Sequence, residues 1–316
     1  MLIFSTSDKG GTGRSVTSCN IAYRLCLAGL NVAYVDFDFG SPTAGALFEI
    51  SAVERGVPGN RGVHSYLLGE SGTAHRVDVG SATDRPQLRR IGPRAGRLVL
   101  VPGDEGGAEF LTCDNAVVTR CAELLVGLEQ EFKVVIVDLS AGRSVALEIA
   151  LKTTAMPQLR HRVARWLIFH RWTRQHILAA AGLVHGAHGL LDTGVAAGHD
   201  KDALLDSLRY VRTAVAETGA EPAGRAEADA ANRLALQAPQ DTWIREQDAI
   251  LKRLASANHL GTITVLGVTP IEPVLQWREQ IVLDFDVNNK IANEATARAY
   301  AELARRLTDN ATWERL

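Results

Sequence analysis

The stretch from Leu2 to Ser15, LIFSTSDKGGTGRS, determines the fold that the rest of the chain has to fit. A short apolar run ends in a glycine-rich loop, and apolar residues then return at helical spacing as far as a stop at Gly29. The pattern predicts a strand, a loop and a helix. Such a loop points consecutive backbone N–H groups into a concave site at the helix N-terminus, where glycines permit the close approach of a phosphate chain. The stretch therefore predicts a phosphate-binding loop.

Two further apolar runs end in carboxylates that suit the same site. Val32 to Val35 leads into Asp36 and Asp38, and Val134 to Val137 leads into Asp138. Ligands of open parallel sheets bind beyond the carboxyl ends of the strands, where carboxylates hold Mg²⁺-bound water or orient an attacking water. For Asp36, a strand-end residue that caps the next turn is an equally good interpretation.

The order of the apolar runs predicts the fold class. Further strands are expected at 98–101, 166–170 and 263–268, and helical stretches separate most of the runs. This alternation predicts an α/β fold with a doubly wound, mostly parallel sheet and helices on both faces. The 316 residues leave room for one large domain or two small ones, and the order of the motifs favours a single domain over 1–316.

The composition is that of an ordinary globular protein, with 46% hydrophobic residues and a net charge of −2. No apolar run reaches the roughly 18 residues of a membrane-spanning helix, and the first residues lack the pattern of a secretory signal. A cytoplasmic location is therefore expected. The four cysteines form no Cys-x-x-Cys pair, which favours reduced thiols.

Several motifs in this order resemble the ParA/MinD family of P-loop ATPases, which carry a deviant Walker A motif. Lys9 to Ser15, KGGTGRS, is similar to the family's KGGxGK[ST]. Val35 to Gly45 resembles the second motif, and Val134 to Gly142 resembles Walker B with its Ala-Gly tail. Val265 to Trp277 resembles the late strand and loop that flank the adenine. The matches cover residues 1 to about 180 and 261 to 307.

The resemblance implies a function and a set of partners. Members of the family form ATP-bound sandwich dimers and switch partners on hydrolysis. The chain is thus expected to bind ATP with Mg²⁺, to form an ATP-dependent homodimer, and to hydrolyse ATP slowly. The switch would control the binding of an unidentified protein partner or cargo, as in partitioning and positioning systems.

The resemblance also implies roles for individual residues. Lys9 matches the signature lysine that reaches the partner's phosphates, and Asp38 matches the carboxylate that positions the hydrolytic water. With Arg14, these two form the expected catalytic set. The expected Mg²⁺ ligands are Ser15, Asp38 and Asp138. The expected nucleotide-binding residues are Gly10, Gly11, Thr12, Gly13, Arg14, Ser15, Val16 and, beside the adenine, Pro270.

One residue departs from the family pattern, because Arg14 stands where the family has the P-loop lysine. Arginine keeps the positive charge, but it is a planar fork and not a compact ammonium, so the exchange is not conservative at a phosphate site. A second hypothesis therefore stays open. The chain would then be a nonhydrolysing, nucleotide-gated scaffold or regulatory protein.

Residues 183 to 260 do not follow the family pattern and are expected to form a helical insertion. Helical patterns run from Ala203 to Val215 and from Thr242 to Leu254, joined by a loop from Glu217 to Arg225. The insertion would be specific to a partner, although plain surface helices are an equally good interpretation.

Charge is unevenly distributed, with no acidic residue between Glu148 and Asp192. The basic stretch 152–174 predicts either nonspecific contact with DNA phosphates or docking against the acidic insertion. A second group of arginines, from Arg85 to Arg97, is expected to lie on a solvated loop. The C-terminus has no basic amphipathic helix, so membrane binding is not expected. A metal site is disfavoured for the loop-rich group His185, His188, His199 and Asp192.

Overall fold

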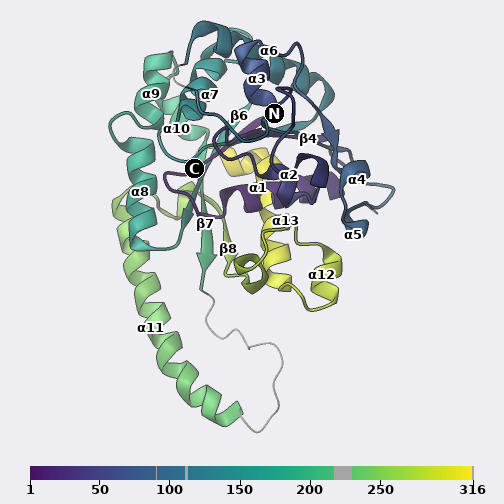
Figure 1. Ribbon diagram of the computed structural model, residues 1–316. Coiled ribbons are helices and arrows are strands. Elements are labelled where there is room, and N and C mark those ends of the chain that lie inside the picture. Colours follow the sequence, from purple (N-terminus) through teal and green to yellow (C-terminus); the bar gives the residue numbers. More distant parts are fainter. Residues whose placement is uncertain (90, 111–112, 217–229, 315–316) are drawn as a thin grey trace.

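The structure is a computed structural model that describes residues 1–89, 91–110, 113–216 and 230–314 (Figure 1). The described residues form one eight-stranded sheet in the order β3-β4-β2-β5-β1-β6-β7-β8. All neighbouring strands are parallel except β3, which pairs with β4 in the antiparallel direction. The strands are β1 (Leu2–Thr6), β2 (Val32–Phe37), β3 (Val77–Asp78), β4 (Leu98–Val101), β5 (Val134–Leu139), β6 (Ala164–Arg171), β7 (Leu208–Val215) and β8 (Val265–Pro270).

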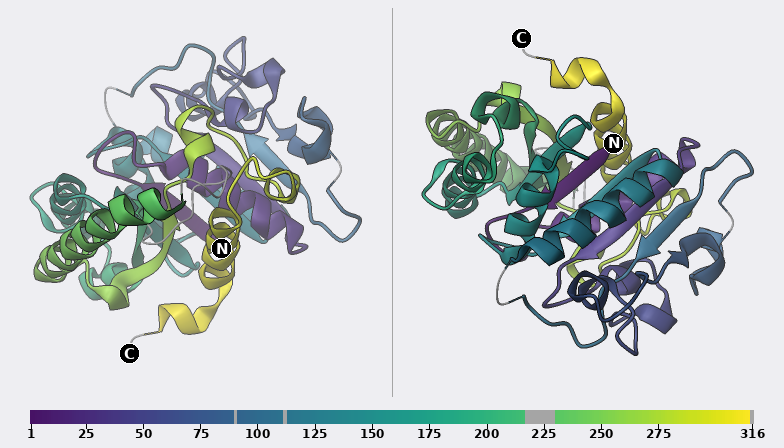
Figure 2. Two further views of the ribbon diagram at one scale, coloured as in Figure 1. Left: turned by 90° about the horizontal axis from the view of Figure 1, so that it is seen from below. Right: turned by 90° about the horizontal axis from the view of Figure 1, so that it is seen from above.

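Helices cover both faces of the sheet (Figure 2). The α-helices are α1 (Arg14–Leu27), α2 (Ala44–Leu47), α3 (Val63–Leu68), α4 (Val79–Ala82), α5 (Pro86–Arg89), α6 (Asn115–Glu131), α7 (Val145–Ala155), α8 (Arg174–His185), α9 (Leu190–Ala197), α10 (Lys201–Asp206), α11 (Ala230–Ala257), α12 (Asp284–Asn288) and α13 (Glu294–Thr308). Short 3₁₀ turns occupy Ser51–Val53, Thr262–Thr264, Pro273–Gln276 and Asn310–Trp313. None of the helices in the described part of the chain combines the length and the apolar character that crossing a bilayer requires.

Two hydrophobic cores lie on opposite faces of the sheet, and the strands alternate between them. Leu2 and Phe4 belong to the core under α3, α6, α7 and α8, whereas Ile3 belongs to the core under α1, α2 and α13. In β2, Val35 faces the first core and Tyr34 faces the second. Since both faces are covered, the strands are apolar at nearly every position, as is typical of parallel sheets. The predicted doubly wound α/β fold is confirmed.

The helix predicted over Ala203–Val215 is wrong, because only its first part is helical. α10 ends at Asp206, and β7 then runs from Leu208 to Val215 between β6 and β8. Two arginines made this strand resemble an amphipathic helix, yet both are buried. Arg212 lies over the Trp172 ring at 4.1 Å, and Arg209 lies over the Trp313 ring at 5.0 Å. Aromatic rings thus shield guanidiniums that a sequence pattern counts as exposed.

The rest of 183–260 is largely helical where the structure describes it. α9 and α10 precede β7, and α11, which contains the predicted helix Thr242–Leu254, extends well beyond the sheet (Figure 1). The predicted loop Glu217–Arg225 lies outside the described residues. The segment therefore supplies helices and also one internal strand of the sheet.

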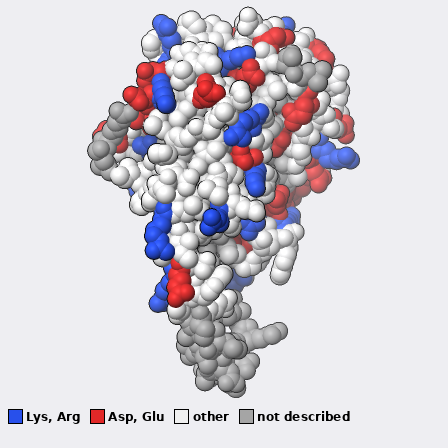
Figure 3. Space-filling model, turned by 90° about the vertical axis from the view of Figure 1, so that its left-hand side faces the viewer, with Lys and Arg blue, Asp and Glu red and all other residues white. Residues whose placement is uncertain are grey.

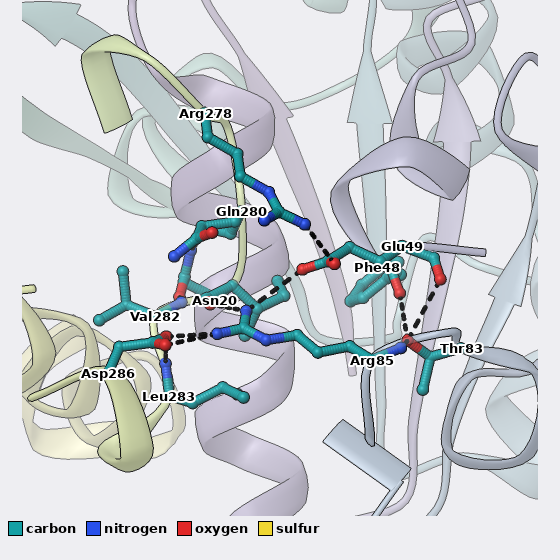
Figure 4. A network of polar contacts seen from close by, with 11 residues as sticks. Asn20, Phe48, Glu49, Thr83, Arg85, Arg278, Gln280, Val282, Leu283 and Asp286 are labelled. Atoms are coloured by element: carbon teal, nitrogen blue, oxygen red, sulfur yellow. Dashed lines mark hydrogen bonds and ion pairs between the residues drawn. The ribbon is translucent and has the colours of Figure 1, made fainter. Parts of the chain in front are cut away.

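The prediction of a solvated arginine loop is wrong for Arg85. Its Nη2 donates to both oxygens of Asp286 at 2.6 Å, and its Nη1 donates to the Ile281 carbonyl at 2.7 Å and lies 3.3 Å from Glu49. Figure 4 shows Arg85 reaching between Glu49 and Asp286. Beside it, Asn20 of α1 bonds to the backbone of the same loop. These contacts fasten the segment that follows β8 to α1 and to the turn after α2.

Candidate functional site

The glycine loop lies between β1 and α1 and leaves open space in front of its backbone. Gly11 and Gly13 have φ angles of 70° and 74°, which glycine adopts without strain. A side chain at Gly10 or Gly11 would meet no atom within 4 Å. Gly13 is the N-cap of α1, and as a glycine it has no side chain that could bond to the first N–H groups of the helix. A helix N-terminus of this kind attracts anions.

Acidic residues from two strands converge on the start of α1. β5 lies between β1 and β2, and Asp138 is in register with Ser5 on one side and Asp36 on the other. Arg14, only 6% exposed, reaches between the strand ends. Its Nε donates to Asp138 Oδ1 at 2.7 Å, and its Nη2 donates to Asp38 Oδ2 at 2.8 Å.

The same guanidinium contacts a third predicted site residue. Arg14 Nη2 lies 3.3 Å from Ser15 Oγ, so one side chain bonds to Ser15, Asp38 and Asp138 together. The other oxygen of Asp138 accepts the hydroxyl of Tyr34 at 2.9 Å. Tyr34 is a buried residue of the site, and in the sequence it is one member of an apolar run. Both oxygens of Asp138 are therefore occupied by donors from the chain itself.

Electrostatics hold Arg14 in its charged form. Burial by itself lowers the pKa of the Arg14 guanidinium, but Asp138 and Asp38 more than offset this effect and raise the pKa above its ordinary value. Burial raises the pKa of Tyr34. The phenol therefore stays neutral and donates a hydrogen bond to Asp138. The centre of the site is thus an ion pair with two carboxylates and one permanent cation.

Asp36 has the geometry of a turn cap. Its Oδ1 accepts the backbone N–H of Asp38 at 3.2 Å, and its Oδ2 accepts that of Ala44 at 3.0 Å. Burial raises the pKa of Asp36 to about 7, and the negative charge of Asp138 contributes to the shift. Of the two interpretations left open by the sequence, this arrangement matches the capping of the turn after β2.

Lys9 lies at the exposed surface of the loop. Its carbonyl accepts the hydroxyl of Ser7 at 3.0 Å, which fixes the backbone of the loop at this point. Burial lowers the pKa of His176, and the positive charges of Arg171 and Lys9 lower it further. The charges of Arg171 and Lys9 therefore both act on His176.

A cavity of about 290 Å³ lies beside the loop. It is bounded by the loop and α1 on one side and by the ends of β6, β7 and β8 on the other. The lining residues include the predicted Val16 and Pro270, and also Arg171, Thr213 and Ala214. Thr213 was missed because its strand was predicted as a helix. Its hydroxyl donates to the Thr12 carbonyl at 2.6 Å and ties β7 to the glycine loop.

A larger depression, of about 890 Å³, opens at the opposite end of the sheet. Met1, Lys133 and Val163, near the amino ends of the strands, contribute to its lining. Ligands of parallel sheets bind at the carboxyl ends. The smaller cavity beside the glycine loop is therefore the candidate site.

The basic stretch 152–174 does not form one surface. Lys152 pairs with Glu148 at 2.7 Å, and Arg165 is 5% exposed. Arg162 precedes the eight-residue strand β6 and Arg171 ends it, so a strand length of roughly 26 Å separates them. On the side of the molecule that carries α8 and α11, basic and acidic side chains are interspersed (Figure 3).

The histidines of 183–260 have ordinary structural partners. His199 Nε2 lies 2.8 Å from the Leu151 carbonyl, and Asp192 accepts the backbone N–H of His188 at 2.9 Å. Within the described ranges, no three His, Cys, Asp or Glu side chains come together in a way that would hold a metal ion.

The parallel sheet, the glycine loop after its first strand and the strand-end aspartates define a P-loop NTPase fold. The chain has the fold of the MinD and ParA ATPases. MinD from Aquifex aeolicus aligns over 97% of this chain and 96% of its own, with a TM-score of 0.56 and 18% identity. A ParA family ATPase from Chlorobium tepidum aligns over 97% and 98%, with a TM-score of 0.53 and 14% identity.

A third solved structure of the same fold was determined with a nucleotide. It is the septum site-determining protein MinD from Pyrococcus horikoshii, complexed with Mg-ADP, which aligns over the full length of both chains with a TM-score of 0.51 and 16% identity. No protein-family model matches the chain, and no curated sequence matches it significantly. The likeness is therefore one of fold.

Proposed function

We propose that the protein is a nucleotide-binding switch of the ParA/MinD type, which binds ATP, forms an ATP-dependent homodimer and thereby changes its affinity for a protein partner. One observation carries the proposal. The glycine loop lines a cavity of about 290 Å³ at the carboxyl ends of the strands, and the Arg14 ion pair lies at the start of the helix that follows the loop. That position is the ligand site of open parallel sheets.

Different parts of the chain would bind different parts of the nucleotide. The backbone of Gly10 to Gly13 would cradle the phosphates, and the cavity beside Val16 and Pro270 would take the base and ribose. The resemblance to the family implies that Ser15, Asp38 and Asp138 hold Mg²⁺ beside the phosphates. Those three side chains are all bonded to Arg14, however, so Mg²⁺ does not fit between them in this arrangement.

The dimer proposal rests on the exposed Lys9. Light scattering coupled to gel filtration, with and without ATP, tests it. We expect the wild type to shift from monomer to dimer with ATP, and Lys9→Ala to stay monomeric. Lys201→Ala, at another exposed lysine, serves as the matched control. An ATP-dependent dimer of Lys9→Ala would contradict the role given to Lys9, and a wild type that never dimerises would contradict the dimer itself.

Slow hydrolysis and its absence remain two candidate functions. Hydrolysis requires Asp38 to orient water, and the bond from Arg14 Nη2 to Asp38 Oδ2 engages one of its oxygens. This bond favours the nonhydrolysing scaffold. Phosphate release is measured for the wild type, Asp38→Ala and Arg14→Lys. Turnover that disappears in Asp38→Ala supports the enzyme, whereas ATP binding without turnover supports the scaffold. Turnover gained only in Arg14→Lys identifies the arginine as the cause.

DNA contact through 152–174 remains a prediction, and basic residues of this stretch lie at both ends of β6. Arg160 and Arg162 lie before β6, whereas Arg174 lies after it. Fluorescence anisotropy with labelled duplex DNA at several salt concentrations measures the binding. One variant replaces Arg160 and Arg162, and a second replaces Arg174. The variant at the end that contacts DNA should bind more weakly and with a flatter salt dependence, and the variant at the other end should bind as the wild type does. Unchanged binding in both variants would contradict DNA contact by this stretch.

A further inference from the structure

Arg14 contacts every side chain that the sequence predicts as a ligand of Mg²⁺. Its nitrogens lie 2.7 Å from Asp138 Oδ1, 2.8 Å from Asp38 Oδ2 and 3.3 Å from Ser15 Oγ. Mg²⁺ requires near-octahedral oxygens at roughly 2.0–2.1 Å. The guanidinium fills the space between the carboxylates that such an ion would have to enter.

We infer that the Arg14 guanidinium takes the place of Mg²⁺ in this site, so that the protein binds a nucleoside triphosphate without a divalent cation. The inference rests on the proposed nucleotide binding and deepens it, because it specifies the metal requirement of the same site. A guanidinium suits the task, since its planar fork can bond to carboxylates and phosphate at the same time.

The orientation of the guanidinium supports a bridging role. Nε and Nη2 bond to the carboxylates, whereas Nη1 makes no hydrogen bond to a described residue. One edge of the guanidinium thus neutralises the two carboxylates, and one nitrogen remains to donate to a phosphate oxygen. A metal ion in such a site joins the same two partners.

The surroundings hold the guanidinium in place. Arg14 is the first residue of α1, so the glycine loop fixes its backbone. Asp138 is 2% exposed and receives a second hydrogen bond from Tyr34. If Arg14 swung away, Asp138 would remain as a buried carboxylate without a cation, which is costly. Because the pKa of Arg14 is raised above an already high value, the positive charge is permanent.

Other cations make up part of the charge that Mg²⁺ would bring. Arginine supplies one positive charge where Mg²⁺ supplies two. Arg171 lines the cavity beside the loop, and Lys9 lies on the loop itself. Both act electrostatically on His176, which places their charges in one neighbourhood. Arg171 thus adds positive charge to the cavity, which Glu272 and Glu279 also line.

The first experiment needs no nucleotide and asks whether a divalent cation can replace the guanidinium. Thermal unfolding is followed for the wild type and Arg14→Ala, in millimolar MgCl₂ or MnCl₂ and in KCl of equal ionic strength. We expect the divalent ions to raise the Tm of Arg14→Ala and to leave that of the wild type unchanged. Arg24→Ala, which removes another α1 arginine that pairs with Asp284, is the matched control and should not respond.

Two results of this experiment would overturn the inference. One is a wild-type Tm that rises with Mg²⁺ as much as that of Arg14→Ala. The other is an Arg14→Ala variant that folds and does not respond to either ion.

The second experiment keeps the inference testable if Arg14→Ala does not fold. A fluorescent ATP analogue is titrated into the wild type and Arg14→Lys, in EDTA and in Mg²⁺. We expect the wild-type Kd in EDTA and in Mg²⁺ to differ by less than about twofold. Arg14→Lys should bind the analogue at least about tenfold more tightly in Mg²⁺ than in EDTA, a difference in binding free energy of about 1.4 kcal/mol. If the wild type binds the analogue about tenfold more weakly in EDTA than in Mg²⁺, the inference is contradicted, but the proposed nucleotide binding is not. A wild type that binds no nucleotide in either buffer contradicts the proposed function, and the inference with it.

Discussion

Replacement of Arg85 tests whether a buried ion pair fastens the segment after β8. Arg85→Ala removes the bonds from Nη2 to both oxygens of Asp286, whose side chain is 3% exposed, and the bonds to Glu49 and the Ile281 carbonyl. Loss of one partner of a buried pair costs about 3–5 kcal/mol, because an uncompensated charge remains. With an unfolding entropy of about 2.1 cal/mol/K per residue over 316 residues, the Tm should fall by about 5–8 °C.

Circular dichroism during heating measures this change, with Arg298→Ala as the control. Arg298 is 73% exposed and lies 3.7 Å from Glu294, so its loss should cost less than about 1 kcal/mol. In a double-mutant cycle, Arg85→Ala with Asp286→Ala should lose less stability than the sum of the single variants. A Tm of Arg85→Ala equal to that of the control would refute the reasoning. Arg85 would then act as an exposed cation on a solvated loop.

Three further variants test the centre of the site. Tyr34→Phe removes the hydroxyl that donates to Asp138 and should lower the free energy of unfolding by about 1.5–3 kcal/mol in urea; unchanged stability would contradict the bond. The pKa of Asp36 is raised to about 7, so the folded protein keeps a proton that the unfolded chain releases near pH 4. The free energy of unfolding should therefore decrease as the pH rises from about 4 to about 7. Thermal unfolding across this range should show a smaller fall for Asp36→Asn, and equal slopes would disprove the assignment. Thr213→Val removes the bond to the Thr12 carbonyl and should cost about 1 kcal/mol and weaken binding of the fluorescent ATP analogue; full affinity would show that β7 does not position the loop.

Much of the sheet could be predicted from the sequence, because local patterns encode it. β1, β4 and most of β2 and β5 are short apolar runs, and a fully covered parallel sheet makes nearly every strand position apolar. β7 could not be predicted in this way. Arg209 and Arg212 are 9% exposed, and the rings of Trp313 and Trp172, distant in sequence, lie over them.

The sequence by itself determined the glycine loop, the acidic residues at two strand ends and the presence of an arginine at position 14. These features depend on residue type and on spacing along the chain. Only the tertiary structure decided where Arg14 points, because its partners Asp38 and Asp138 follow different strands. A side-chain contact between distant segments depends on the register of β1, β2 and β5, which no local pattern specifies. Sequence identified the cation, and the packing of the strands placed it between the two carboxylates.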